Sequence, residues 1–558
     1  MQCSISYQIE RYITKFIFPL ELACRSSHPI MVPIYHAKEV EQVFDAISYN
    51  KGSTIVRMAQ YVLGTTKFRE GLQLYCKRHA YSNTETSDLW QAWSEVSGID
   101  MSSLMTSWTQ QLGYPYIVVD EETWTDAGVS LKLKQGWFLN DGSEVTGDDA
   151  AKCWSIPLLI ASSADVGNDT GSKDSGVMDA ANIARTGTFE RVLSLPKRSD
   201  GCASWVKLNA NQSVLLRVSH TATMISRLTT AILRGEVSAI DRAALVDDQF
   251  FLGMTGRAPM ELFANCLPAF RGEANTTVWK ALAPTLTQLL SALLSVSSSD
   301  SVPVVSYKNF AKDLVMSAFN LVGWDAKEGE DETFKLMRGT IFSLVEAFCA
   351  DEPSILAEAR HRFSLSLTVP ADEASQFISS DIKGAVYRIV LSKGSEVEFN
   401  QIMNTYKNTS EDAIRKWALT TLGSAPTRAL KVKVMEWALS GDVKLQDLYQ
   451  PMMSVSAAGA EGREVAWTFF KDNFAHIQEK VAKANIWTMT AIIVACTSKF
   501  STHELADEME AFFVEHPVKG VEKRVSQIIE RTRANAGLSE QVKKSALMSD
   551  EFWQNFGK

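Results

Sequence analysis

The sequence predicts a multidomain α+β protein with a helical lobe, then a small β-sandwich, then a large C-terminal α-superhelix of paired helices. Three observations predict this fold. The chain has 558 residues, and single cores stop growing near roughly 250–300 residues. Apolar residues recur at helical spacing up to residue 112 and again after residue 220, whereas the stretch between them alternates with a period of two. We therefore expect domains at residues 1–112, 113–218 and 219–558.

Three amphipathic stripes predict helices in the first 112 residues. Thr86-Ser87-Asp88 is a capping cluster before the second stripe, and Gly98 ends that stripe. The apolar positions of the three stripes are Ile55, Val56, Met58, Ala59, Val62 and Leu63; Leu89, Trp90, Trp93 and Val96; and Leu104, Met105, Trp108 and Leu112.

The pattern of residues 113–218 predicts β-strands. Val129, Leu131 and Leu133 alternate with polar residues, as in a half-buried strand. Short apolar runs recur at residues 154–160, 192–195, 205–208 and 214–218. Together they predict a small β-sandwich. Residues 162–182 are rich in Ser, Gly, Asp and Asn, which predicts a loop inside the sandwich.

The remaining residues form a long series of amphipathic helices separated by short polar breaks. The Leu-rich stripe that begins at Leu286 follows Pro284, which we expect in the first turn of its helix because a missing N–H is tolerated there. The clearest interruption is residues 295–300, S-V-S-S-S-D. No strict repeat period is visible, so the superhelix is predicted from helix content alone.

Composition excludes several functional classes. The net charge of −9 and a pI near 5.6 argue against nucleic acid as a partner, because phosphate binding needs a basic face. No apolar run approaches the roughly 18 residues that a membrane span needs. The eight cysteines are scattered without a C-x-x-C pair, which favours reduced thiols, and the start does not resemble a signal peptide. We expect a cytoplasmic protein.

One short segment carries the functional signal. Residues 45–52 read D-A-I-S-Y-N-K-G and follow R-S-S-H-P-I at residues 25–30. This pattern closely resembles the segment around the catalytic tyrosine of the zinc aminopeptidases related to aminopeptidase N and the puromycin-sensitive enzyme. The resemblance extends over residues 25–558, the C-terminal half of that family. Its further landmarks are residues 74–84, 88–90, 108–115, 135–139, 154–158, 241–242, 440–447 and 533–535.

The resemblance implies both architecture and activity. Residues 1–112 would be the end of a thermolysin-like catalytic domain, followed by the β-sandwich and a superhelix of the HEAT or ARM type. The complete family member removes N-terminal residues from peptides with one catalytic zinc. Tyr49 matches the tyrosine whose phenol donates a hydrogen bond to the oxyanion of the transition state, a task that suits a neutral donor at pH 7.

The zinc-binding helix of the family has no counterpart in this sequence. Such a helix needs two histidines four residues apart with a glutamate between them, and no two of the eight histidines have that spacing. The nearest lookalike is residues 503–507, H-E-L-A-D, for which we expect a solvated helix face. The family's G-x-M-E-N segment, which holds the substrate amine, is absent as well. We therefore expect this chain to be inactive alone, with peptides as the substrates of the complete protein.

Residues 1–20 do not resemble the family, and residues 214–218 keep only the last two positions of its G-x-Y-R-V strand. Tyr49 has an alternative reading as a buried tyrosine that opens a helix, with Gly52 permitting close packing. His28, which follows two serines, is expected in a loop or cap because no G-x-S-x-G accompanies it. We expect Arg217 to pair with a carboxylate in the sandwich, the alternative being that it points at the chamber. We expect Asp241-Arg242 to cap and brace the first helices of the superhelix.

Two further expectations concern the packing of the first helices and an alternative function. The stripes of the first 112 residues would leave an apolar face open to water, because their usual packing partner is not part of this sequence. The six residues most expected to be open are Ile55, Val56, Met58, Val62, Trp90 and Trp93. The alternative function is that of a non-catalytic helical-repeat protein, which binds peptides or a partner on its concave surface. The absence of a zinc helix is the feature that favours this alternative.

Overall fold

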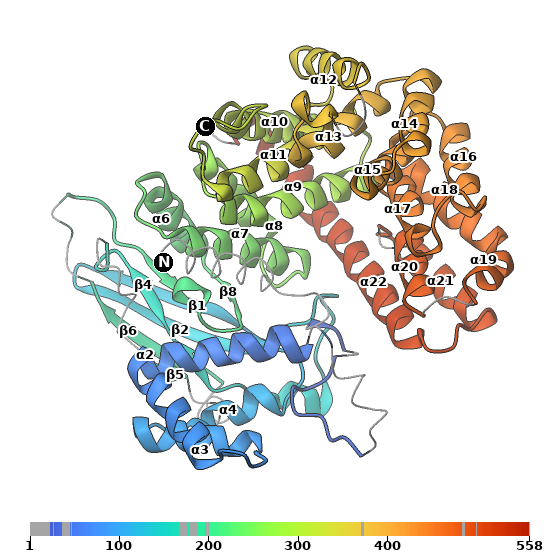
Figure 1. Cartoon of the computed structure of the whole chain (residues 1–558). Coiled ribbons are helices and arrows are strands. Elements are labelled where there is room, and N and C mark those ends of the chain that lie inside the picture. Colours follow the sequence, from blue (N-terminus) through green and yellow to red (C-terminus); the bar gives the residue numbers. More distant parts are fainter. Residues whose placement is uncertain are drawn as a thin grey trace. The chain divides into compact units, whose positions relative to one another are not determined.

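The computed structural model shows a mostly helical protein with a small amount of β-sheet (Figure 1). It forms two compact units, one of residues 1–271 and 544–558 and one of residues 272–543. The three predicted domains do not coincide with these units, because the division after residue 271 falls inside the predicted domain 219–558. The domain boundaries stay a prediction. The structure describes residues 23–25, 27–35, 45, 47–166, 176–178, 180, 187–195, 198, 200–369, 373–482, 486–497 and 499–556.

The first unit begins with the predicted helices. A π-helical turn, η3 (Ile47–Lys51), leads into α2 (Gly52–Arg78), and α3 (Thr86–Ser97) and α4 (Met101–Thr109) follow. Helix α2 is kinked at Gly64, whose φ of 73° is costly for other residues. Helix α3 begins with a capping box between Glu85 and Asp88 and ends at Gly98 in the left-handed conformation, close to the predicted limits.

The β-sheets of the unit follow. A four-stranded sheet has the order β6-β2-β1-β8, with β1 and β8 parallel and the other pairs antiparallel. Two short antiparallel pairs, β3 with β5 and β4 with β7, complete the β-structure that the described residues contain. The strands are β1 (Pro115–Thr125), β2 (Gly128–Trp137), β3 (Ile156–Leu158), β4 (Ile160–Ser162), β5 (Gly176–Met178), β6 (Phe189–Ser194), β7 (Val206–Leu208) and β8 (Arg217–Ser219).

Two strand predictions need correction. The segment expected to be only loop, residues 162–182, contains strand β5, which pairs with β3 through Met178 opposite Ile156. The run expected at residues 214–218 forms a strand only from Arg217, and Val214 to Leu216 are buried outside any ladder. In both places burial against a neighbour, and not local alternation, decided the outcome.

Part of the predicted superhelix belongs to the first unit, namely helices α6 (Ala222–Leu233), α7 (Ala239–Met254), α8 (Met260–Cys266) and α23 (Asp550–Asn555). The second unit is entirely helical in its described part. Its helices are α9 (Thr276–Val296), α10 (Val302–Val322), α11 (Glu332–Cys349), α12 (Pro353–Ser366), α13 (Ser380–Ser392), α14 (Glu396–Asn408), α15 (Asp412–Thr421), α16 (Arg428–Leu439), α17 (Tyr449–Ala457), α18 (Gly459–Asp472), α19 (Phe474–Val481), α20 (Ile486–Thr497), α21 (His503–Glu515) and α22 (Glu522–Lys544).

The expected position of Pro284 is wrong. Helix α9 begins at Thr276, so Pro284 lies well inside it and not in its first turn. A proline there removes one backbone hydrogen bond and presses on the carbonyl of the preceding turn. The helix continues because its buried face, which includes Leu282, Leu286 and Leu289, packs into the core of the unit.

The expectation of an open apolar face on the first helices is also wrong. Ile55, Met58, Trp90 and Trp93 are at most 8% exposed. They belong to one continuous hydrophobic core that runs from α2, α3 and α4 into strands β1 to β8. Of the six residues expected to be open, only Val56 is exposed. The helices bury their apolar stripes against one another and in the core that they share with the strands. None of the described helices is long and apolar enough to span a membrane.

Candidate functional site

The segment around Tyr49 is a tight turn held by its own side chains. Asp45 accepts hydrogen bonds from the backbone N–H of Ile47 (2.9 Å) and of Ser48 (3.0 Å), and its carbonyl accepts one from the N–H of Tyr49 (3.2 Å). A carboxylate in this position satisfies donors that a helix start leaves open. The Ser53 hydroxyl donates to the carbonyl of Tyr49 at 2.6 Å. The backbone of Tyr49 is therefore fixed from both sides.

His28 completes this turn. Its Nε2 lies 2.7 Å from a carboxylate oxygen of Asp45, and its Nδ1 lies 2.7 Å from the carbonyl of Pro29. Because Asp45 already accepts two backbone hydrogen bonds, the imidazole holds the carboxylate that shapes the Tyr49 turn. The expected loop or capping role of His28 agrees with this geometry.

The Tyr49 side chain itself is not a buried helix opener. It is 61% exposed, and a Cβ added to Gly52 would meet nothing within 4 Å. The alternative reading of this residue, burial with close packing at Gly52, is therefore wrong. An aromatic ring on a braced backbone turn can present its phenol to a ligand with little loss of conformational entropy.

Lys51 anchors the same turn from inside. Its side chain is fully buried, and its ammonium donates a hydrogen bond to the carbonyl of Gln111 at 2.7 Å. Burial lowers the pKa of Lys51 to about 7, because desolvation disfavours the charged form. The contact connects the end of η3, just before α2, to the segment after α4. In the sequence Lys51 is only one position of the motif at residues 45–52, and no local pattern predicts this anchoring role.

Arg57, two turns further along α2, connects the helix to a strained loop after β7. Its guanidinium donates to the carbonyls of Asn211 (3.0 Å) and Gln212 (3.2 Å). Asn209, Asn211 and Gln212 all have positive φ values, between 48° and 59°, which is costly for residues with a side chain. Strain of this kind persists only where surrounding contacts enforce it.

Buried charges enforce the strained loop. The N–H of Asn211 donates to Asp241 at 2.7 Å. Lys207, only 1% exposed, lies 3.1 Å from the same Asp241 carboxylate and donates to the carbonyls of Leu208 and Asn209. Asp241 also accepts from the hydroxyl of Ser238, the N-cap of α7. The expected capping and bracing role of Asp241 is confirmed.

A second buried ionic cluster lies between β8 and α7. Arg217 is 1% exposed, and its guanidinium lies 3.5 Å from Asp248. Arg217 therefore pairs with a carboxylate as expected, but its partner lies on helix α7 and not in the sandwich. Burial raises the pKa of Asp248 to about 6 and that of Asp247 to about 7, although the charge of Arg217 opposes both shifts. The cluster joins the sheet to the first helices of the C-terminal region.

These pKa values predict a pH-dependent stability. Above pH 7 the folded protein must ionise Asp247 in a buried site, whereas the unfolded chain does so from about pH 4, so stability falls as pH rises through that window. Asp247→Asn removes this penalty. We expect it to raise the free energy of unfolding by roughly 1–4 kcal/mol at pH 8 and to have little effect at pH 4. Urea unfolding at both pH values measures this difference. Asp126→Asn, at an exposed turn, is the control and should change neither value.

Comparison with known protein families gives two matches. Residues 19–108 match the model of the peptidase family M1 domain, and residues 205–534, more than half of the chain, match the ERAP1-like C-terminal domain. The chain belongs to the M1 aminopeptidase family. The first match contains Tyr49, and the second contains both the strained loop and the Arg217 cluster. The resemblance found in the sequence is thereby confirmed.

Curated relatives agree with this assignment. The chain is 29% identical to aminopeptidase M1-B of rice over 535 residues, which cover 93% of this chain and 57% of the relative. It is 29% identical to aminopeptidase M1 of Arabidopsis thaliana, with 93% and 56% covered. It is 26% identical to the puromycin-sensitive aminopeptidase of Caenorhabditis elegans, with 93% and 52% covered. This member of the M1 family thus spans little more than half the length of these relatives.

The described residues of this M1 family member do not fit a metal centre. Among them no three His, Cys, Asp or Glu side chains are grouped closely enough to hold an ion. The lookalike at residues 503–507 has other contacts: His503 lies 3.4 Å from Glu540, and Asp507 lies 2.9 Å from Arg533. Both side chains are about half exposed or more. The expected solvated helix face describes this segment correctly.

Proposed function

We propose that this chain forms the C-terminal part of a zinc-dependent aminopeptidase that removes N-terminal residues from peptides. In this proposal, residues 1–112 are the end of a thermolysin-like catalytic domain, residues 113–218 are a β-sandwich and residues 219–558 are an α-superhelix. The aminopeptidase names of the relatives and the two family matches support the activity. The sheets and the long helical region support the architecture.

The observation that carries the proposal is the exposed Tyr49 on its braced turn. We infer that its phenol donates a hydrogen bond to the substrate carbonyl oxygen as that oxygen gains negative charge. A preorganised donor aimed at developing charge is worth several kcal/mol in a water-poor site. Asp45 and His28 fix the turn, Lys51 anchors it, and Arg57 sets its position relative to the strained loop. These four would be positioning residues and not catalytic ones.

The zinc of the complete protein has no ligand set among the described residues of this chain. We therefore assign no residue here to the metal, and Tyr49 remains the single catalytic residue that we propose. Peptides are the proposed partners, and the net charge of −9 speaks against nucleic acid. The free thiols of Cys76, Cys153, Cys202, Cys266, Cys349 and Cys496 are in keeping with a reducing, cytoplasmic location.

The chain alone should neither turn over peptides nor retain stoichiometric zinc. Without a bound metal nothing lowers the pKa of water toward 7, and a phenol cannot replace that function. Metal analysis of the purified chain, together with hydrolysis of aminoacyl fluorogenic amides, measures both properties. One tightly bound zinc with turnover that chelators abolish would contradict the prediction. The double variant His503→Ala/Asp507→Ala would then show whether the lookalike helix is the site.

The alternative function is peptide or partner binding without catalysis. A polar pocket in the helical unit supports this alternative. The two functions differ in what Tyr49 does. Catalysis needs its hydroxyl, whereas a binding role of the helical unit does not involve it. Loss of the Tyr49 hydroxyl should therefore leave ligand binding by residues 272–543 unchanged under either function. Only under the first function should it lower turnover, by about 10²–10³-fold, in an active aminopeptidase that contains this chain.

A further inference from the structure

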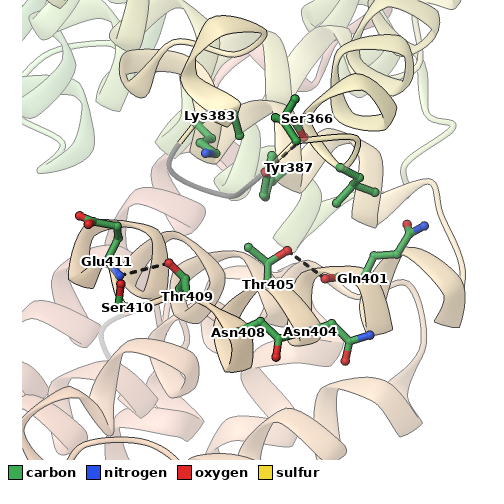
Figure 2. Close-up of a pocket in the computed structure, with 13 residues that line it drawn as sticks. Ser366, Lys383, Tyr387, Gln401, Asn404, Thr405, Asn408, Thr409, Ser410 and Glu411 are labelled. Atoms are coloured by element: carbon green, nitrogen blue, oxygen red, sulfur yellow. Dashed lines mark hydrogen bonds between the residues drawn. The ribbon is translucent and has the colours of Figure 1, made fainter.

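A polar pocket lies within the second unit, between helix α14 and the helices α12 and α13. Its volume is about 560 Å³, a size typical of small-molecule sites. Figure 2 shows α14 with Gln401, Asn404 and Asn408 on one side and Lys383 with Tyr387 on the other. The pocket contains none of the residues proposed above for catalysis. An inference about it therefore goes beyond the proposed function.

Lys383 is the central feature of this pocket. Its side chain is 1% exposed, and its ammonium lies 4.4 Å from the ring centre of Trp417 and 5.7 Å from that of Tyr387. Among the residues that the structure describes, no carboxylate or other oxygen accepts a hydrogen bond from it. Aromatic faces attract a cation but accept no conventional hydrogen bond. Burial of an ammonium without an acceptor is costly, and burial lowers the pKa of Lys383 to about 8.

Helix α14 supplies unused hydrogen-bonding groups opposite this lysine. The side-chain amides of Gln401, Asn404 and Asn408 line the pocket, and none of them bonds to another described residue. Asn404 and Asn408 are one helical turn apart, so their amides lie about 6 Å from each other along the pocket wall. Each amide offers two donors and an acceptor. A ligand with several polar groups would satisfy them together.

We propose that this pocket binds a small monocarboxylate that carries amide or hydroxyl groups, with its carboxylate on the Lys383 ammonium and its polar groups on the α14 amides. A single charge matches a single lysine. A phosphate dianion fits less well because the described residues that line the pocket include no arginine and the Glu411 carboxylate is present at its wall. The ligand would give the buried ammonium the acceptor that the described protein groups do not supply.

Calorimetric titration of the full chain tests the proposal. N-acetylglycine carries a carboxylate and an amide, and gluconate carries a carboxylate and hydroxyls. N-acetylglycinamide is the control for N-acetylglycine, because an uncharged amide replaces its carboxylate. We expect saturable binding of at least one carboxylate, with the neutral amide at least tenfold weaker. The carboxylate that binds more tightly shows whether the ligand's polar groups are amides or hydroxyls. Absence of binding by both, or equal binding of inorganic phosphate, would overturn the proposal.

Two variants locate the site. Lys383→Met keeps the buried stem and should weaken the carboxylate at least tenfold. Lys433→Met is the matched control, because Lys433 also lies over an aromatic ring, that of Phe399 at 5.4 Å, but is half exposed and outside the pocket. If Lys383→Met does not fold, the exposed Asn408→Leu should still weaken binding at least threefold. A folded Lys383→Met protein that binds as tightly as the unaltered chain would refute the site. So would undiminished binding by Asn408→Leu.

Discussion

Tyr49→Phe should lower kcat by about 10²–10³-fold in an active aminopeptidase that contains this chain, because that is the usual effect of removing one oxyanion donor. The substitution removes a single hydroxyl from a side chain that is 61% exposed, so the fold should not change. KM should change little if the hydrogen bond forms mainly in the transition state. The measurement needs a chimera that joins the N-terminal part of Arabidopsis aminopeptidase M1, outside the match, to this chain.

Tyr61→Phe is the matched control for that experiment. Tyr61 lies on α2, the helix that follows the Tyr49 turn; it is 42% exposed and its substitution loses only a weak contact of 3.4 Å with Arg57. Its substitution should leave kcat within about twofold, far below the effect of removing an oxyanion donor. A phosphinic transition-state analogue should lose affinity for Tyr49→Phe in parallel with kcat/KM. Equal losses in the two variants, or an undiminished kcat in Tyr49→Phe, would contradict the role proposed for Tyr49.

Arg217→Met should destabilise the first unit by about 3–5 kcal/mol, the usual effect of removing one partner from a buried ion pair. Arg217 stacks 4.2 Å from the ring centre of Phe251 and contacts Asp248. Methionine retains much of the apolar contact but leaves Asp247 and Asp248, both fully buried, without the guanidinium. Urea unfolding at pH 8, followed by circular dichroism, measures the loss.

The pH dependence of that loss separates charge from packing. At pH 5 both aspartates can take up a proton in the folded state, since their pKa values, about 6 and 7, lie above that pH. The loss should therefore be clearly smaller at pH 5 than at pH 8. Arg78→Met, which breaks the exposed pair with Glu95, should lose no more than about 1 kcal/mol at either pH. Equal losses of Arg217→Met at the two pH values would show that packing alone is responsible.

Much of the fold could be predicted because local patterns and burial agree. The stripes of α2, α3 and α4, the alternation in β2 and the cap at Gly98 appear in the structure at nearly their predicted positions. The errors occurred where burial overrides local preference. Pro284 is retained inside α9 because the flanking apolar residues are fully buried, and β5 forms in a segment of loop-like composition because it pairs with β3.

The sequence by itself determined the family, the three regimes of secondary structure and the position of Tyr49, because a short motif and its periodic surroundings are local properties. Only the tertiary structure decided which distant residues serve that tyrosine. His28 reaches Asp45 across 17 positions, Lys51 reaches Gln111 across 60, and Arg57 reaches the strained loop across more than 150. It also decided that the apolar stripes of the first helices are buried in this chain, and that Lys383 lacks a described acceptor. Such contacts depend on how distant parts of the chain pack together, which no local sequence pattern specifies.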